Sequence, residues 1–413
     1  MTAPAAPAPN PHPGMGFKQF TALIAMLMAM NALAIDAMLP ALPQIGAALR
    51  IATENDRQWI ITAYLLGFGA APLAYGVLSD RFGRKPVLLF GVCLYIIASI
   101  LAGFAGSLET MLIARLCQGI GAASTRVLSV AIVRDCYSGR RMAKVMSLVF
   151  IVFMTVPILA PSLGQVIVTF APWRWIFGVL AIFGIVILIW AGVRLPETLH
   201  PEDRLPINLR RILEAMRLTL TNRVAIGYTL AMTFTMGGLF GFINSAQQIF
   251  VDIFHAGPMF PAVFALIVVF MAASSLLNSR IVERLGTRRV SHTAIIGFIT
   301  FSVIHAAIAI SGHETIYSFA IMQALTMFCF GLIGSNFGAM AMEPLGHIAG
   351  TASSVQSTIT TMGGAIAGLF IGQHFDGTVV PLTVGFSLFG TIAFITVLIT
   401  ERGRLFHSTT GAL

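Results

Sequence analysis

Long apolar stretches, separated by short polar ones, dominate this chain from end to end. About 20 apolar residues are needed for a helix to cross the hydrocarbon core of a bilayer. Twelve stretches reach this length, at roughly 20–40, 59–78, 86–106, 110–133, 145–170, 175–193, 224–250, 260–278, 293–311, 316–342, 348–372 and 379–400. The eleventh is the weakest because it is rich in Ser, Thr and Gly. The pattern predicts an all-α membrane protein with twelve transmembrane helices.

Composition excludes a soluble domain of this length. Of the 413 residues, 57% are hydrophobic and only 10% are charged, and the mean hydropathy is +0.88. The net charge of +9 follows the loops rather than a nucleic-acid surface, so we expect no nucleic-acid partner. We also expect no cofactor. The cysteines, Cys93, Cys117, Cys136 and Cys329, show no paired or metal-type spacing, so we expect no disulfide and no metal.

The distribution of basic residues predicts the orientation. One set of loops carries only Arg50, Arg57 and Arg174, whereas twenty of the 25 Lys and Arg fall in the other loops and tails. Since basic loops stay in the cytoplasm, both termini should be cytoplasmic. Residues 1–16 are rich in Ala and Pro and lack the features of a signal peptide, so we expect a disordered cytoplasmic tail.

The longest polar interruption divides the helices six and six. We therefore expect an N-terminal bundle at 17–194, a cytoplasmic linker at 195–221, a C-terminal bundle at 222–401 and a second tail at 402–413. Parallel six-helix repeats of this kind occur in transporters.

A tight polar loop, GVLSDRFGRKPVLL, joins the second and third stretches. It resembles the signature loop of the major facilitator superfamily, in which it acts as a conformational lock; the matching residues are Gly76, Asp80, Arg81, Gly83, Arg84 and Lys85. A weaker copy follows 203 positions later in the second half, at Glu283, Arg284, Gly286 and Arg288.

The fifth stretch carries VPILAPSLGQ, which resembles the antiporter motif of drug exporters. Pro157, Pro161 and Gly164 should kink the helix and allow a neighbour to approach closely. Ala160 and Gln165 replace two glycines of that motif, so a purely structural kink remains an alternative.

The fourth stretch contains Arg115, Gln118 and Gly119, and resembles the exporter motif built on a membrane arginine followed by Gln-Gly. Together with AIDAMLPALP, the Arg134–Asp135 pair and AGTASS, the resemblance narrows to the bicyclomycin-resistance (Bcr/CflA) group of drug:proton antiporters. This resemblance implies drug efflux across the bacterial inner membrane in exchange for protons.

Charged side chains inside membrane helices are costly and mark functional sites, and three stand out: Asp36, Arg115 and Arg126. Asp36 and Arg115 lie at similar depth and could pair, with Asp36 as proton carrier. Asp36 could instead be a helix-end carboxylate in outer water, and Arg126 could snorkel toward the cytoplasm.

Uncharged polar groups on several helices complete the predicted substrate site with these three charges; they are Asn31, Tyr64, Gln118, Asn244, Gln247 and Asn336. Each of them could equally join helices by hydrogen bonds. One acid against two bases favours neutral, zwitterionic or weakly anionic substrates over dications.

We therefore expect a monomeric, proton-coupled exporter of small drugs, with the drug, protons and the lipid bilayer as its partners. A proton-coupled sugar or metabolite exporter on the same fold is the alternative. An enzyme or a channel is disfavoured, because the sequence contains no H-E-x-x-H or G-x-S-x-G motif and no filter-like repeat.

Overall fold

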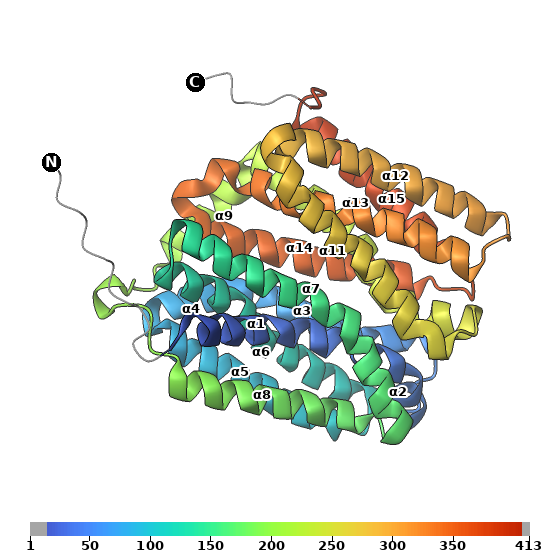
Figure 1. Ribbon diagram of the computed structural model, residues 1–413, viewed down its shortest axis with the longest axis horizontal. Helices are drawn as coiled ribbons and strands as arrows, with labels where there is room; N and C mark the ends of the chain where they lie inside the picture. Colours follow the sequence, from blue (N-terminus) through green and yellow to red (C-terminus); the bar gives the residue numbers. More distant parts are fainter. Residues whose placement is uncertain (1–14, 407–413) are drawn as a thin grey trace.

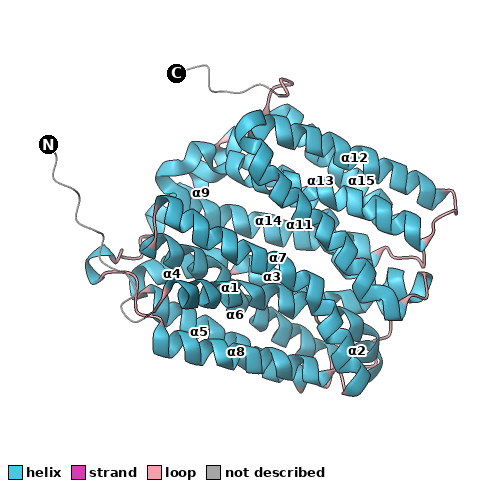
Figure 2. Ribbon diagram, viewed as in Figure 1, coloured by secondary structure: helices cyan, strands magenta, loops and turns pink. Residues whose placement is uncertain are grey.

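The computed structural model describes residues 15–406, which form helices and connecting loops (Figure 2). The first half contains α1 (Phe17–Asp36), α2 (Leu42–Ala48), α3 (Trp59–Ala70), α4 (Pro72–Phe82), α5 (Arg84–Gly103), α6 (Leu108–Cys136), α7 (Gly139–Phe170) and α8 (Arg174–Arg194). The second half contains α10 (Arg223–Gln247), α11 (Phe260–Leu285), α12 (Thr287–Ile310), α13 (Ile316–Met342), α14 (Ala349–Gln373) and α15 (Val380–Thr400). Most of the predicted tails, at 1–14 and 407–413, lie outside the described residues.

The expected twelve-helix membrane fold is confirmed. Eleven of the described helical segments are long and apolar enough to cross a membrane, and a twelfth span is formed by α3 and α4 together. These two helices meet at a bend of 41°. The bend falls at Pro72, whose missing N–H cannot continue the hydrogen-bond ladder of α3.

The two halves lie side by side, with the first half in blue to green and the second in yellow to red (Figure 1). Helices α3 and α7 of the first half pack against α14 and α11 of the second. Both ends of the described chain lie at the same end of the bundle, the first near α4 and the second beside the beginning of α12 (Figure 1). We call this the terminal end, and the opposite one the distal end.

Each half contains the same turn between its second and third spans. Gly83 and Gly286 end one helix and precede the next, with φ of 105° and 82°, a region that favours glycine. The repeat read from the sequence is thus present in the backbone.

The linker contains a helix that the sequence pattern did not predict, α9 (Leu209–Thr221). Ala215 and Thr219 are buried on its inner face, whereas Leu209 and Leu213 are exposed. It packs against α14 and α10 at the terminal end.

Candidate functional site

Arg115 is fully buried in the interface between α6 and α3. Its Nε donates to the carbonyl oxygen of Ile60 at 3.1 Å, and its Nη1 donates to Oε1 of Gln118 at 2.5 Å. Gln118 in turn donates to the hydroxyl of Ser99 on α5 at 2.7 Å. The guanidinium is therefore held by dipoles of α3 and α6, while its Nη2 has no partner in the described part of the chain.

Two arginines of α6 lie on two aromatic rings of α3. The guanidinium of Arg115 is 4.5 Å from the centroid of the Tyr64 ring, and that of Arg126 is 5.5 Å from the Phe68 ring. The two rings are stacked, with centroids 6.2 Å apart and planes 10° from parallel. Cation–π attraction partly compensates charges that have no counter-ion nearby.

Asn31 joins this interface from α1. It accepts a hydrogen bond from the Tyr64 hydroxyl at 3.2 Å and donates to Thr125 of α6 at 3.2 Å. Of the predicted substrate-site residues, the structure thus brings Asn31, Tyr64, Arg115 and Gln118 into one connected network inside the first half.

The network depends on backbone contact between α3 and α6. A Cβ added at Gly119 would lie 2.0 Å from the carbonyl oxygen of Tyr64, and one added at Gly67 would lie 2.1 Å from that of Leu116. No side chain fits at either position without separating the helices. Glycine in the Gln-Gly motif is therefore explained by packing.

Replacing Gly119 by Ala is expected to lower the free energy of unfolding by about 1–3 kcal/mol or more, because the helices must move apart. Thermal unfolding of the purified protein measures this. Gly192→Ala is the matched control, since a Cβ there meets no atom within 4 Å. Equal melting temperatures of the two variants would contradict the packing argument.

Asp36 is the last residue of α1 and is only 5% exposed. The expected ion pair with Arg115 is absent: no ion pair within residues 15–406 includes either side chain. The reason is that Arg115 extends toward Ile60 and Tyr64 of α3, whereas Asp36 lies where α1 meets α7. The predicted Asp36–Arg115 pair is not formed in this structure.

The predicted antiporter motif lies beside Asp36. A Cβ added at Gly164 of α7 would lie 1.9 Å from the carbonyl oxygen of Ala37, the residue after Asp36. Pro157 and Pro161 lie inside α7, which continues through both of them. The motif was expected to let a neighbouring helix approach closely. The structure shows this approach between Gly164 of α7 and Ala37, the residue after Asp36.

The remaining predicted polar residues lie in the second half. Asn336 of α13 donates to Asn278 of α11 at 2.8 Å, so it joins two helices within its own half. Asn244 of α10 donates to Thr62 of α3 at 3.4 Å, across the two halves. The Nε2 of Gln247 is buried without a partner among the described residues.

Four amides, which the sequence did not single out, connect the two halves at the distal end. Asn55 and Gln58 belong to the first half, and Gln248 and Gln373 to the second; we call these four residues the amide clasp. Side chains of Gln58 and Gln248 are joined at 2.7 Å, and those of Gln248 and Asn55 at 2.9 Å.

Backbone acceptors complete the amide clasp. Asn55 donates to the carbonyl oxygens of Gln373 (3.1 Å) and Phe375 (2.9 Å), and Gln58 donates to that of Gly372 at 2.9 Å. Gln373 donates back to the carbonyl oxygen of Asn55 at 2.7 Å. Six hydrogen bonds thus close this end of the molecule. Hydropathy could not find them, because Asn55 and Gln58 lie in a polar connection, Gln248 and Gln373 lie at the ends of apolar spans, and hydropathy does not report contacts between segments.

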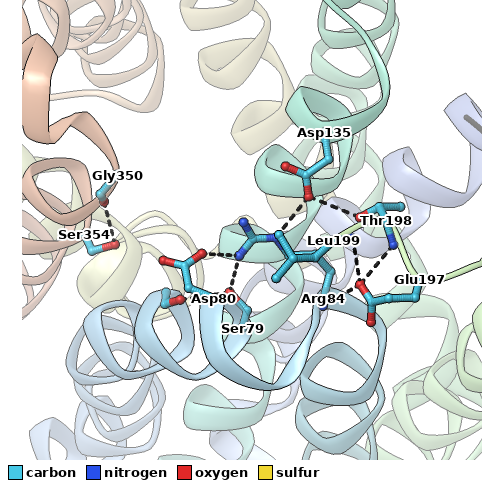
Figure 3. A network of polar contacts seen from close by, with 10 residues as sticks. Ser79, Asp80, Arg84, Asp135, Glu197, Thr198, Leu199, Gly350 and Ser354 are labelled. Carbon is cyan, nitrogen blue, oxygen red and sulfur yellow. Dashed lines mark hydrogen bonds and ion pairs between the residues drawn. The ribbon is translucent and has the colours of Figure 1, made fainter. Parts of the chain in front are cut away.

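At the terminal end, Arg84 of the signature loop is 5% exposed and binds two carboxylates (Figure 3). Its guanidinium contacts Asp80 on α4 and Asp135 at the end of α6, the latter at 3.0 Å. Glu197 accepts from the backbone N–H groups of Arg84 and Lys85 at 2.8 and 3.2 Å, and so caps α5. Burying the guanidinium of Arg84 is costly, and the carboxylates of Asp80 and Asp135 compensate this cost.

The second half repeats this arrangement with other residues. Arg288 binds Glu401 at 3.1 Å and Glu343 at 3.2 Å. The hydroxyl of Tyr228 donates to Glu401 at 2.6 Å and lies 3.1 Å from Nε2 of His292. Glu283, the counterpart of Asp80, is in no ion pair within residues 15–406.

A cavity of about 280 Å³ lies at the terminal end between the halves. It is lined by α4, α6 and the beginning of α14, and both Asp80 and Arg126 face it. On its distal side α3 and α14 are in contact, since a Cβ added at Gly69 would lie 2.9 Å from the backbone nitrogen of Met362. The cavity is therefore separated from the distal end by this contact and the amide clasp.

A buried acid and base at the distal end were also missed. Nε2 of His305 lies 3.7 Å from Glu314, and the two side chains are 2% and 7% exposed. Ser318 donates to the same carboxylate at 2.7 Å. His305 lies on α12 and Glu314 in the loop after it, about nine residues later. This spacing matches no known motif, so the sequence did not indicate the contact.

Comparison with known proteins identifies the family to which this helical arrangement belongs. Residues 24–368 match the family model of the Major Facilitator Superfamily. A bicyclomycin resistance protein homolog of Haemophilus influenzae is 30% identical over 366 residues, covering 88% of this chain and 91% of the relative. Multidrug resistance protein MdtL of Shigella dysenteriae is 31% identical over 328 residues, covering 79% and 80%.

A solved structure supports the fold. The D-xylose-proton symporter has a TM-score of 0.73 at 14% identity, with 91% of this chain and 95% of the symporter covered. At this identity the likeness concerns the fold alone. The family match spans most of the chain, and the chain belongs to the major facilitator superfamily of membrane transporters.

Proposed function

We propose that this protein exports small drugs across the bacterial inner membrane in exchange for protons, by alternating access of a central site. The observation that carries the proposal is that the molecule is closed at the distal end and has a cavity at the terminal end. Six hydrogen bonds of the amide clasp join the halves at the distal end, and a cavity with charged walls lies at the terminal end.

The excess of basic residues at the terminal end supports a cytoplasmic location for it, because positively charged loops are retained there. The molecule then faces the cytoplasm in this structure. A drug would enter the cavity from that side, and release requires the amide clasp to open. The relatives named for bicyclomycin and multidrug resistance support drugs as the cargo.

Asp36 is the residue that we propose to carry the proton, with Arg115 acting through the α3 and α6 network rather than by contact. A carboxyl group that is almost completely buried, with no ion pair among the described residues, is costly to keep charged and marks a functional position in a membrane protein. Its place beside Gly164 of α7 links it to the predicted antiporter motif.

Drug resistance in a bacterial strain lacking its own pumps tests this function. Expression should protect against neutral, hydroxylated drugs such as amphenicols, and protection should disappear when an uncoupler removes the proton gradient. Poor protection against a dication such as methyl viologen is also expected. Export of sugars without any drug resistance would contradict the proposal and favour a metabolite carrier.

Replacing Asp80 by Asn is expected to reduce transport at least tenfold while the protein still folds and inserts. Arg84 keeps Asp135 and the Ser79 hydroxyl as partners, so the local structure should persist. Asp80, however, faces the beginning of α14 at Gly350 and Ser354 across the cavity (Figure 3). Its charge favours closure onto that positive helix end, and the neutral variant loses this attraction.

The matched control is Glu283→Gln, at the equivalent position of the second half, where no ion pair is formed in the described structure. Drug transport by equal amounts of each purified variant provides the measurement. Full transport by Asp80→Asn, or an equal loss in both variants, would count against a locking role for Asp80.

A further inference from the structure

The two membrane arginines have different surroundings. Arg115 has no exposed surface and is held by Ile60 and Gln118. Arg126 is ten residues from the end of α6, which at 1.5 Å per residue places it roughly 15 Å inside the bundle. Yet its side chain is exposed, because it lines the cavity. Of the two arginines, Arg126 is the one that a ligand in this cavity can reach.

The charge of Arg126 is not balanced by the protein. Asp80 carries the single carboxylate among the described lining residues, and this carboxylate is bound by Arg84. Arg84 is further occupied by Asp135. Neither Arg126 nor Arg134, which lies nearer the cavity mouth, belongs to an ion pair within residues 15–406. The cavity therefore contains an excess of positive charge.

The opposite wall offers hydrogen-bond donors from the other half of the protein. It is formed by the first turns of α14, where Thr351 and Ser357 line the cavity. Within residues 15–406 the hydroxyls of Thr351 and Ser357 make no hydrogen bond, whereas those of Ser353 and Ser354 donate to the carbonyl oxygen of Gly350. The first N–H groups of a helix also lack partners within the helix and favour a negative charge. A ligand placed between Arg126 and α14 would contact both halves.

We propose that Arg126 binds a carboxylate, or a comparable group with one negative charge, on drugs that enter from the terminal end. The inference rests on the proposed function and names the substrate class for the same site. A guanidinium stays charged at any physiological pH and can donate two parallel hydrogen bonds to a carboxylate. Because the ligand joins Arg126 of the first half to α14 of the second, acidic substrates favour closure of the terminal end.

The ring of Phe68 positions this guanidinium. Arg126 lies 5.5 Å from its centroid, and the stacked Tyr64 behind Phe68 is fixed by Asn31 and Arg115. The buried network therefore serves as the support of the exposed cation. This division explains why one arginine of α6 is sealed and the other faces the cavity.

A matched pair of compounds tests the proposal: nalidixic acid, which carries a carboxylate, and its neutral ethyl ester. Binding of each is measured on the purified full-length protein by equilibrium dialysis, and transport is measured in energised vesicles. We expect R126Q to bind and transport nalidixate at least tenfold less well than the unmodified protein, with less than a twofold change for the ester. R126K, which keeps the charge but not the planar fork, should lie between them.

The control variant is R140Q at the start of α7, an exposed arginine at the same end, and it should behave like the unmodified protein. Failure of the unmodified protein to bind nalidixate, an equal loss of acid and ester in R126Q, or unchanged nalidixate binding in R126Q would overturn the inference. Selective loss of nalidixate binding in R126Q supports the inference about Arg126, whatever the vesicles show. Absence of drug transport in the vesicles would instead contradict the proposed export function.

Discussion

Simultaneous replacement of Asn55 and Gln58 by Ala is expected to move most molecules to a state that is open at the distal end. The double variant removes the side chains from all but one of the six hydrogen bonds of the amide clasp. A protein hydrogen bond contributes about 0.5–1.5 kcal/mol net. Since states of a transporter differ by a few kcal/mol, losing several bonds should shift their ratio by roughly a hundredfold.

Pulsed electron paramagnetic resonance measures this opening as the distance between two spin labels. The labels are attached to cysteines that replace Ala52 and His313, both exposed at the distal end, in a variant without its native cysteines. The distance distribution should move to longer values in the double variant. Gln44→Ala, an exposed amide at the same end, serves as control and should leave the distribution unchanged. An unaltered distribution in the double variant would show that the amide clasp does not hold this end closed.

Replacing Asp36 by Asn is expected to abolish proton-coupled export, with drug accumulation against a gradient reduced at least tenfold. Asparagine has nearly the same size and keeps hydrogen-bonding capacity, but it cannot bind and release a proton. The side chain is 5% exposed and makes no ion pair in the described structure, so its loss should not unfold the protein.

Drug efflux driven by an imposed pH gradient measures the effect. Asp376→Asn is the control, because this exposed distal carboxylate accepts its hydrogen bonds among residues 15–406 from Thr378 of its own loop. If Asp36→Asn still couples efflux to the pH gradient, the buried carboxylate of Glu314 beside His305 becomes the better candidate for the proton site.

The helices and the repeat could be predicted from the sequence because they depend on local patterns. Runs of about 20 apolar residues define spans independently of their neighbours, and Gly83 and Gly286 indicate turns by themselves. The amphipathic helix α9 was missed because it is short and its polar face resembles a linker.

Contacts between side chains of different helices were harder to predict than the depth of each side chain in the membrane. Asp36 and Arg115 do lie in the expected helices, but depth does not define which way a side chain points around the helix axis. Arg115 turns toward α3, where Tyr64 and the carbonyl of Ile60 stabilise it. Such partners on a neighbouring backbone leave no trace in the sequence.

The amide clasp was missed for a related reason. Asn55, Gln58, Gln248 and Gln373 are ordinary polar residues in their own segments, separated by up to about three hundred positions. Their importance arises only when the two halves meet. Arg126, in contrast, stood out in the sequence as a membrane charge, and the structure adds that it faces a cavity.

Drug-dependent proton movement in reconstituted vesicles tests the central claim most directly. The purified protein is placed in vesicles with equal pH on both sides and a pH-sensitive dye inside, and a neutral amphenicol is added outside. Exchange predicts that the interior becomes more alkaline as drug enters and protons leave, and that Asp36→Asn shows no such change. Drug entry without a pH change, or with acidification of the interior, would contradict proton-coupled export.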